Sequence, residues 1–379
     1  MSTPFDVVVV GAGIIGAACA WELSTAGLRV AIVDEAFPGA GATGAAMGHI
    51  VVMDDSEAQF ALTHYSQRLW DELEAELPRN VEFDRCGTIW VASDEEEFAE
   101  VRRKAAHYEQ RGVRTEILDS HALRDAEPNL MGGFRGGLLV SRDSVIYPPA
   151  GAAFFLDRAA QRGTAMHFGK AVTAFGQGRV GLADGTVLQA VRLVNAAGQR
   201  SPRLTPGIPV KPRKGHLVIT DSYPGFLRHQ LVELGYLKSA HSLTSDSVAF
   251  NLQPRKTGQV LIGSSRQYGA EDDRVETAIV SKMLKRAFDY VPALADLSCI
   301  RVWTGFRPAA PDKLPLIGPW PEDPTVYLAT GHEGLGITTS LATAKLLRAQ
   351  ILQEAAAIPQ ETYLPSRSTA KESEAPEHG

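Results

Sequence analysis

Three glycines near the start of the chain have the spacing of a phosphate-binding turn. Gly11, Gly13 and Gly16 directly follow an apolar run at residues 7–10. Gly11 allows a sharp turn, Gly13 lets a pyrophosphate approach the backbone, and Gly16 lets a helix pack closely on a strand. The following helix would direct unpaired N–H groups at the phosphates. The predicted contacts of this unit are Gly11, Gly13, Ile14, Ile15, Gly16, Asp34 and Glu35.

Asp34 favours a dinucleotide as the ligand. It ends a second apolar run, about 20 residues after the first glycine, where an acid holds a ribose hydroxyl in such units. An acid at this point, rather than arginine, favours FAD or NAD over NADP. The alternative is a glycine-rich turn in an ordinary α/β protein.

A run dense in Gly, Ala and Thr follows at residues 36–52. Such a thin backbone suits close contact with a flat ligand, and a linker is the alternative. The predicted contacts in this run are Thr43, Gly44, Ala45, Met47, Gly48 and His49.

The far end of the chain repeats the order of strand, glycine-rich turn and helix over residues 326–352. The helix N-terminus could stabilise negative charge on a ligand, with glycine allowing close approach. The predicted contacts here are Gly331, Gly334, Leu335, Gly336, Ile337 and Thr338. The strand at residues 167–175 adds Val172, and the apolar strand ending at 194–198 adds Ala197 and Gly198.

The remaining elements indicate an α/β fold with two interleaved domains. Helical spacing appears at residues 57–77, 94–112, 151–163 and 275–294, and a strand pair is expected at 81–93. Segments 1–80, 146–208 and 300–358 are expected to form a Rossmann-like nucleotide domain. Segments 81–145 and 209–299 would form a β-rich, α+β substrate domain, and residues 359–379 a disordered tail.

Composition excludes several classes of protein. The chain has 379 residues, a net charge of −6 and no basic stretch that suggests nucleic-acid binding. Its apolar runs are far shorter than the roughly 20 residues that a membrane span requires. The three cysteines are widely separated, which argues against a disulfide framework or a metal site. A cytoplasmic protein, with peripheral membrane association as an open option, is expected.

Several stretches together resemble the D-amino-acid oxidase superfamily of flavoproteins, in its glycine oxidase and D-hydroxyproline dehydrogenase branch. They are collinear over about residues 5–352. The stretches are VVVVGAGIIGAACAWEL, GATGAAMGHI, LVNAAGQRSP, NLQPRKTGQVLIGSSRQ, WTGFRPAAPDKLPLIG and ATGHEGLGITTSLATAKLL. The resemblance implies a Rossmann-like FAD-binding domain, non-covalent FAD and oxidation of an amine next to a carboxylate.

The resemblance also suggests the residues of the catalytic site. Arg307 matches the position that binds the substrate carboxylate, with Arg301 as its rival. Gly305 stands where sarcosine oxidase-like members carry the cysteine that binds FAD covalently. His49, His332 or a water could accept the amine proton.

Two substrate-domain residues are added to this candidate site. Asn251 occupies a place where glycine oxidase-like members often have tyrosine, and Tyr236 could compensate from a neighbouring strand. An amide in place of a phenol suits an amine that carries its own hydroxyl.

The expected reaction is therefore FAD-dependent oxidation of a small amino or imino acid at its Cα–N bond. The resemblance points to cis-4-hydroxy-D-proline, giving 1-pyrroline-4-hydroxy-2-carboxylate. The alternatives are another D-amino acid, an N-methyl amino acid or glycine, a 2-hydroxy acid, and a flavoprotein subunit of a multi-subunit dehydrogenase. The electron acceptor is a quinone, a dye or oxygen, and a homo-oligomer or contact with a respiratory chain stays open.

Overall fold

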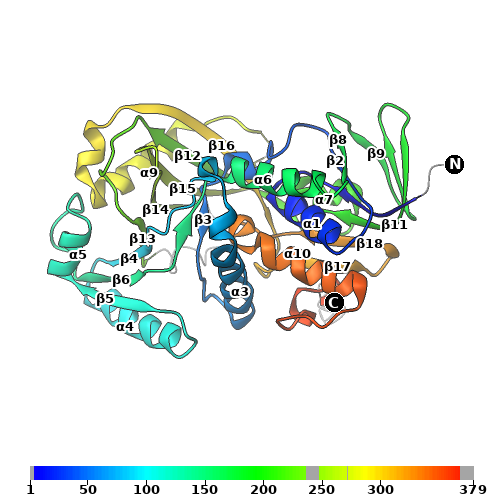
Figure 1. The fold of residues 1–379 in the computed structure, drawn as a ribbon. Coiled ribbons are helices and arrows are strands. Elements are labelled where there is room, and N and C mark those ends of the chain that lie inside the picture. Colours follow the sequence, from blue (N-terminus) through cyan, green and yellow to red (C-terminus); the bar gives the residue numbers. More distant parts are fainter. Residues whose placement is uncertain (1–3, 236–246, 271, 368–379) are drawn as a thin grey trace, which may run out of the picture.

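The computed structural model describes residues 4–235, 247–270 and 272–367. Within them the chain forms two eight-stranded sheets, each with its own helices (Figure 1). A two-stranded sheet of β3 (His49–Ile50) and β7 (Ser144–Val145) adds a small third element.

The first sheet is mostly parallel and has the order β17-β18-β11-β1-β2-β8, with the hairpin β9-β10 attached to β11. Its central strand β1 is paired in parallel with both β2 and β11, and it is buried on both faces, which its run of valines allows. The strands are β1 (Phe5–Val10), β2 (Val30–Asp34), β8 (Ala165–Phe168), β9 (Val172–Gly176), β10 (Arg179–Leu182), β11 (Val187–Asn195), β17 (Leu316–Trp320) and β18 (Asp323–Thr330).

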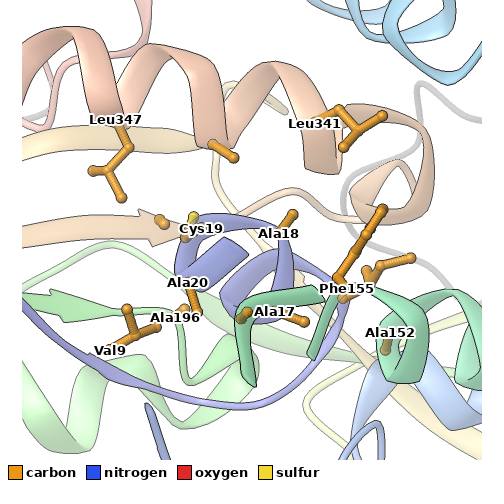
Figure 2. Packing of buried hydrophobic residues seen from close by; sticks show 14 of the residues in the cluster. Val9, Ala17, Ala18, Cys19, Ala20, Ala152, Phe155, Ala196, Leu341 and Leu347 are labelled. Carbon is orange, nitrogen blue, oxygen red and sulfur yellow. The ribbon is translucent and has the colours of Figure 1, made fainter. Parts of the chain in front are cut away.

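Helix α1 (Ile14–Thr25) is the centre of the first core. It packs against α6 (Pro148–Ala160) and α10 (Gly336–Leu352), and α10 also packs against α3 (Glu57–Leu73). Figure 2 shows Ala18 on the side of α1 toward α10, which carries Leu341, and Ala17 on the side toward α6, which carries Phe155. Because α1 carries small apolar residues on every side, neighbouring helices and the sheet can approach it closely.

The second sheet has the order β16-β12-β15-β14-β13-β4-β6-β5 and is antiparallel except where β13 meets β4. Its strands are β4 (Thr88–Ala92), β5 (Thr115–Asp119), β6 (Gly136–Val140), β12 (Lys211–Thr220), β13 (Gln230–Glu233), β14 (Ser247–Pro254), β15 (Val260–Tyr268) and β16 (Cys299–Ala309). Its helices are α4 (Glu95–Glu109), α5 (Ser120–Ala126) and α9 (Thr277–Tyr290). The short helices elsewhere are α2 (Ala42–Ala45), α7 (Ser201–Leu204), η1 (Glu74–Glu76), η2 (Arg79–Val81), η3 (Gly198–Arg200), η4 (Pro292–Asp296) and η5 (Glu361–Tyr363).

The α/β fold with interleaved segments is confirmed, because both sheets draw strands from separate parts of the chain. The sequence assigns residues 300–358 to the nucleotide domain, whereas β16 pairs along β12 in the second sheet. We therefore propose that the substrate domain extends to about residue 310, and we retain the other domain boundaries as proposals. The expected strand pair at 81–93 is wrong in part, since only β4 is a strand there and η2 occupies its start.

The prediction of a disordered tail is wrong for residues 359–367. Tyr363 is 1% exposed, and its hydroxyl donates to the backbone oxygen of Ala58 at 2.6 Å. Arg367 forms an ion pair with Asp312. Burial of an aromatic ring fixes this segment against α3, which its polar composition does not reveal. Residues 368–379 lie outside the described part.

The described residues contain neither a helix that could span a bilayer nor a cluster of side chains suited to a metal ion.

Candidate active site

A cavity of about 1040 Å³ lies where the two sheets meet, and residues from both of them line it. It is at the upper end of the range for ligand sites, roughly 300–1,000 Å³. The glycine turn after β1 lines one part, and β12, β14 and β16 line another. A long ligand could therefore contact both sheets at once.

The glycine turn has the geometry that its sequence predicts. Gly11 has a φ of +112°, and a side chain there would lie 2.3 Å from the oxygen of Ala196. A Cβ on Gly16 would lie 1.8 Å from the oxygen of Gly11, so Gly16 serves packing and does not line the cavity. Gly13 lines the cavity, and its Cβ position meets only the Thr43 hydroxyl, at 3.2 Å.

Helix α1 directs its N-terminus at this cavity. Its N-cap, Gly13, has no side-chain cap, and the N–H of Ile14 donates to Thr43 Oγ1 at 3.0 Å. The first turn thus offers N–H groups and a partial positive charge to an anion.

Asp34 both fixes the turn and faces the cavity. Its Oδ2 accepts the N–H of Ala12 at 2.6 Å, and its Oδ1 accepts the N–H of Ala36 at 2.9 Å. Each carboxylate oxygen keeps a further lone pair, so a ribose hydroxyl could still donate to it. Glu35 also lines the cavity and forms an ion pair with Arg200.

The small-residue run lies between the two sheets. Ala45 contacts β16 so closely that a Cβ on Gly305 would lie 2.4 Å from the Ala45 Cβ, and Trp303 Nε1 donates to the Ala45 oxygen at 3.2 Å. Met47 lies against Gly263 of β15. A Cβ on Gly48 would lie 1.7 Å from the oxygen of Ile146, so this glycine serves backbone packing.

The turn before α10 closes the other side of the cavity. Gly334, Gly336 and Ile337 line it, and the N-cap Leu335 leaves α10 without a side-chain cap. Two helix N-termini whose N-cap residues make no side-chain cap bond therefore meet the same cavity, a suitable arrangement for a ligand that is negatively charged at two places.

The polar residues of this turn have partners within the fold. His332 Nε2 lies 2.9 Å from Thr343 Oγ1, and burial lowers the pKa of His332 to about 3, so the ring is neutral. Glu333 forms an ion pair with Arg213 of β12. The Thr338 hydroxyl donates to the backbone oxygen of His49 at 2.9 Å, which joins α10 to β3.

Arg307 of β16 presents a cation to the cavity. Its guanidinium lies over Gly215 of the paired strand β12, where a Cβ would be 2.4 Å from a guanidinium nitrogen. The same side chain donates to the backbone oxygen of Ser265 at 3.0 Å. Burial, followed by the charge of Arg213, lowers the pKa of Arg307 to about 10, so it stays charged at neutral pH.

Within the described residues, no carboxylate forms an ion pair with Arg307. Partial burial of an unpaired cation costs free energy that a bound anion would offset, so the position of Arg307 favours a site for an anionic group. Its rival, Arg301, is exposed and stacks over Trp303 at 5.3 Å, away from the residues that line the cavity.

His49 lies near Arg307 and is held by two amides. Its Nδ1 contacts Gln230 Oε1, and its Nε2 lies 3.3 Å from Asn251 Nδ2. Burial is the largest cause that lowers the pKa of His49, to about 4, and the charge of Arg307 lowers it further. The ring is therefore neutral at physiological pH.

A family model described as FAD dependent oxidoreductase (DAO) matches residues 6–350. The chain belongs to this family.

Individual relatives match over nearly the whole chain. Hydrogen cyanide synthase subunit HcnC of Pseudomonas aeruginosa is 30% identical, covering 93% of this chain and 94% of that protein. Glycine oxidase of Geobacillus kaustophilus is 27% identical over 92% of this chain and 93% of that protein. A crystal structure of glycine oxidase from this organism has a TM-score of 0.86 at 25% identity and covers 97% of this chain and 99% of that one. L-proline dehydrogenase from P. horikoshii shares the fold, with a TM-score of 0.87 at 22% identity, covering 98% of this chain and 99% of that one.

The cofactor of this DAO-family enzyme is FAD, and the residues present fit it. Gly13 lines the cavity without a side chain, Asp34 offers lone pairs, and two helix N-termini face the cavity. The predicted residues that line the cavity are Gly11, Gly13, Ile14, Ile15, Asp34, Glu35, Thr43, Ala45, Met47, His49, Val172, Ala197, Gly198, Asn251, Gly305, Arg307, His332, Gly334, Gly336 and Ile337. Those that support it from behind are Gly16, Gly44, Gly48, Gly331, Leu335 and Thr338. Tyr236 lies outside the described residues.

Sequence reasoning missed two residues that hold the polar groups of the site. Gly215 makes room for Arg307, and an isolated glycine inside a strand pattern is a usable signal of such close approach. Gln230 holds His49, and nothing local to its sequence indicates this, because the two residues are 181 positions apart.

Proposed function

We propose that this enzyme oxidises a small amino or imino acid at its Cα–N bond. The observation that carries the proposal is Arg307, a partly buried cation that lines the cavity and has no acidic partner among the described residues. A planar guanidinium can bind both oxygens of a substrate carboxylate. The similarity to proteins named glycine oxidase supports an amino-acid substrate.

The chain's own residues would bind and orient this substrate. Arg307 would hold the substrate carboxylate, and His49 and Asn251 would contact other polar groups of the substrate. Bound FAD supplies the acceptor for the hydride that leaves the substrate Cα. The amine must be uncharged when this happens, and either a water or His49, once Asn251 releases its Nε2, would accept its proton. His332 is retained as a further candidate, although its Nε2 contacts Thr343.

Within this class we propose cis-4-hydroxy-D-proline as the substrate and 1-pyrroline-4-hydroxy-2-carboxylate as the product. The pair of Asn251 and His49 supports a substrate with its own hydroxyl, because both side chains are polar and line the cavity. Other D-amino acids, N-methyl amino acids, glycine and 2-hydroxy acids are the alternatives to be tested beside it.

Anaerobic bleaching of the protein-bound flavin tests this assignment. We expect cis-4-hydroxy-D-proline to bleach the flavin faster than glycine, sarcosine or a 2-hydroxy acid of similar size. Bleaching by none of the amino or imino acids contradicts the proposed function. Bleaching by glycine or sarcosine, but not by a cyclic imino acid, supports the reaction class and refutes the hydroxyproline assignment.

A second candidate function is that of a flavoprotein subunit in a larger dehydrogenase. The 30% identity to a hydrogen cyanide synthase subunit favours it. Electrons would then pass to a partner chain or a quinone, in the cytoplasm or at the membrane surface. Turnover of the purified single chain with an artificial dye at the rate of its flavin bleaching would contradict an obligate complex.

We further propose that FAD is bound without a covalent bond at residue 305. Gly305 has no nucleophilic side chain and lies against Ala45. Acid precipitation should therefore release the yellow cofactor into the supernatant, whereas a coloured pellet would contradict this.

A further inference from the structure

A chain of three hydrogen bonds runs from the cavity through β3 and β13 to the backbone of β7. Asn251 Nδ2 lies 3.3 Å from His49 Nε2, His49 Nδ1 contacts Gln230 Oε1, and Gln230 Nε2 lies 3.2 Å from the backbone oxygen of Ser144. Gln230 is fully buried on β13. Asn251 and His49 line the cavity, whereas Gln230 lies behind them.

The backbone oxygen at the end of this chain fixes the direction of every bond in it. The Ser144 oxygen can only accept, so Gln230 must turn its NH₂ group toward it. Gln230 Oε1 then faces His49, and it also can only accept. His49 Nδ1 must therefore carry the hydrogen, because the reverse arrangement would place two carbonyl oxygens against each other.

The tautomer of His49 also fixes the orientation of the Asn251 amide. With a hydrogen on Nδ1, a neutral imidazole has its lone pair on Nε2. Asn251 must then present its NH₂ group to His49 and turn its Oδ1 elsewhere. The second N–H of that NH₂ group remains for a ligand with a lone pair, such as a hydroxyl or an uncharged amine.

The surroundings of the ring keep it neutral. The cation that faces it is Arg307 of β16, which disfavours a second positive charge. On the side of β7, Asp143 precedes Ser144 and bonds to Val52 and Gln67 rather than to the ring, and Asp84 bridges to Val145 through its backbone. The neighbouring Cys86 thiol is protonated, since burial raises its pKa to about 12.

We propose that Gln230 is a positioning residue that fixes His49 in the Nδ1–H tautomer and thereby sets which atoms of Asn251 meet the substrate. This rests on the proposed function only for the identity of the group that binds there. The tautomer itself is a property of the protein. With the other tautomer, His49 would donate from Nε2, Asn251 would reverse, and an N–H donor of the pocket would be replaced by a carbonyl oxygen.

The direct test is the ¹⁵N spectrum of the FAD-loaded protein labelled at histidine, with the His49 signals assigned by their loss in His49→Gln. We expect a neutral Nδ1–H pattern that does not titrate above about pH 5. Gln230→Met removes the acceptor at similar volume and should give mixed tautomers. Gln230→Glu places a carboxylate at Nδ1 and should raise the pKa of His49 by at least one unit. A neutral Nε2–H pattern in the unaltered protein would overturn the proposal.

A matched control separates this role from a merely structural one. Gln253 of β14 is equally buried, and its Oε1 accepts the N–H of Gly48 at 2.8 Å without touching the ring. Gln253→Glu should therefore leave the His49 pattern unchanged. The acid limb of the pH profile of flavin bleaching should move upward by at least one pH unit in Gln230→Glu, which is up to about a tenfold loss of kcat/KM below pH 4, and it should stay in place in Gln253→Glu.

The two proposals can fail separately. If no amino or imino acid bleaches the flavin but the ¹⁵N patterns are as expected, the proposed function is wrong and the tautomer assignment holds. If bleaching occurs but Gln230→Glu and Gln253→Glu give identical ¹⁵N patterns and pH profiles, the role of Gln230 is refuted.

Discussion

At the scale of single residues, the site is organised by charged and polar groups whose partners come from distant strands. Arg307 is held from β12 and β15, through Gly215 and the Ser265 oxygen. Neither contact neutralises its charge, so the remaining guanidinium donors are available to a ligand. The fold positions the cation, and under the proposed function the substrate carboxylate would balance its charge.

Arg307→Ala should mainly raise KM for the substrate. Loss of one partner of a hydrogen-bonded charge pair costs about 2–5 kcal/mol, so kcat/KM should fall by roughly 30- to 5,000-fold. Arg307→Lys keeps the charge without the planar fork and should give an intermediate loss. The exposed Arg301 provides the control, because Arg301→Ala should change kcat/KM by less than about twofold. Equal effects of the two alanine variants would contradict the role of Arg307.

Asp143 should make stability depend on pH. Burial is the largest cause that raises its pKa from 3.8 to about 7. Between those values the folded chain binds a proton that the unfolded chain releases, so this stabilisation is present in acid and is lost as pH rises to about 7. The slope contributed is up to about 1.4 kcal/mol per pH unit. Asp143→Asn should flatten the decline in the free energy of unfolding between pH 5 and 7, and an unchanged slope would refute this.

At the scale of elements, two helices from opposite ends of the sequence begin at one cavity. Helix α1 starts at the glycine turn after β1, and α10 starts at the turn after β18. The two helices also pack on each other, so their N-termini are fixed relative to one another. Thr338 ties the start of α10 to β3, which carries His49.

Gly13→Ala should weaken FAD binding without much change in the stability of the apoprotein. The backbone at Gly13 has a φ of −69°, which alanine adopts readily, and the added Cβ meets only Thr43 before it projects into the cavity. We expect at least a tenfold rise in the dissociation constant, measured by fluorescence titration with FAD. Gly27→Ala is the control, since Gly27 has a φ of +85° at the other end of α1 and open space around it. It should lower stability by about 1 kcal/mol and leave FAD affinity unchanged.

Local patterns predict the parts of this site that depend on neighbours in sequence. The glycine turn, the acid at the end of β2 and the turn before α10 are short stretches. Their residue types meet conformational and hydrogen-bonding requirements of the adjacent backbone. The contacts of Tyr363 with Ala58, and of Gln230 with His49, join segments 305 and 181 residues apart and leave no periodic signal. The membership of β16 in the second sheet was hidden for the same reason, since strand pairing is decided by register with β12.

At the scale of the whole molecule, the cavity joins two sheets that have separate hydrophobic cores. A ligand that contacts both sheets would stabilise their relative placement, which the two separate cores do not do by themselves. Binding to the folded chain alone adds about 2.7 kcal/mol when the ligand is at 100 times its dissociation constant.

Removal of FAD should therefore lower the Tm and make unfolding less cooperative. Scanning calorimetry of holoprotein and apoprotein should show one transition with FAD and a broader or divided one without it. Adding FAD back should restore the single transition, with a Tm that rises with the FAD concentration. Identical traces with and without FAD would show that the cofactor does not join the two sheets.

The contact between Gly305 and Ala45 also constrains how a covalent flavin attachment could evolve at residue 305. A cysteine at residue 305 would place its Cβ 2.4 Å from that of Ala45, closer than two carbon atoms can stand. The first mutant would be destabilised by the clash before any bond to the flavin could form. A lineage that acquires a tethered cofactor at this point would therefore have to lose the Ala45 methyl group first, so the order of the two mutations is set by sterics.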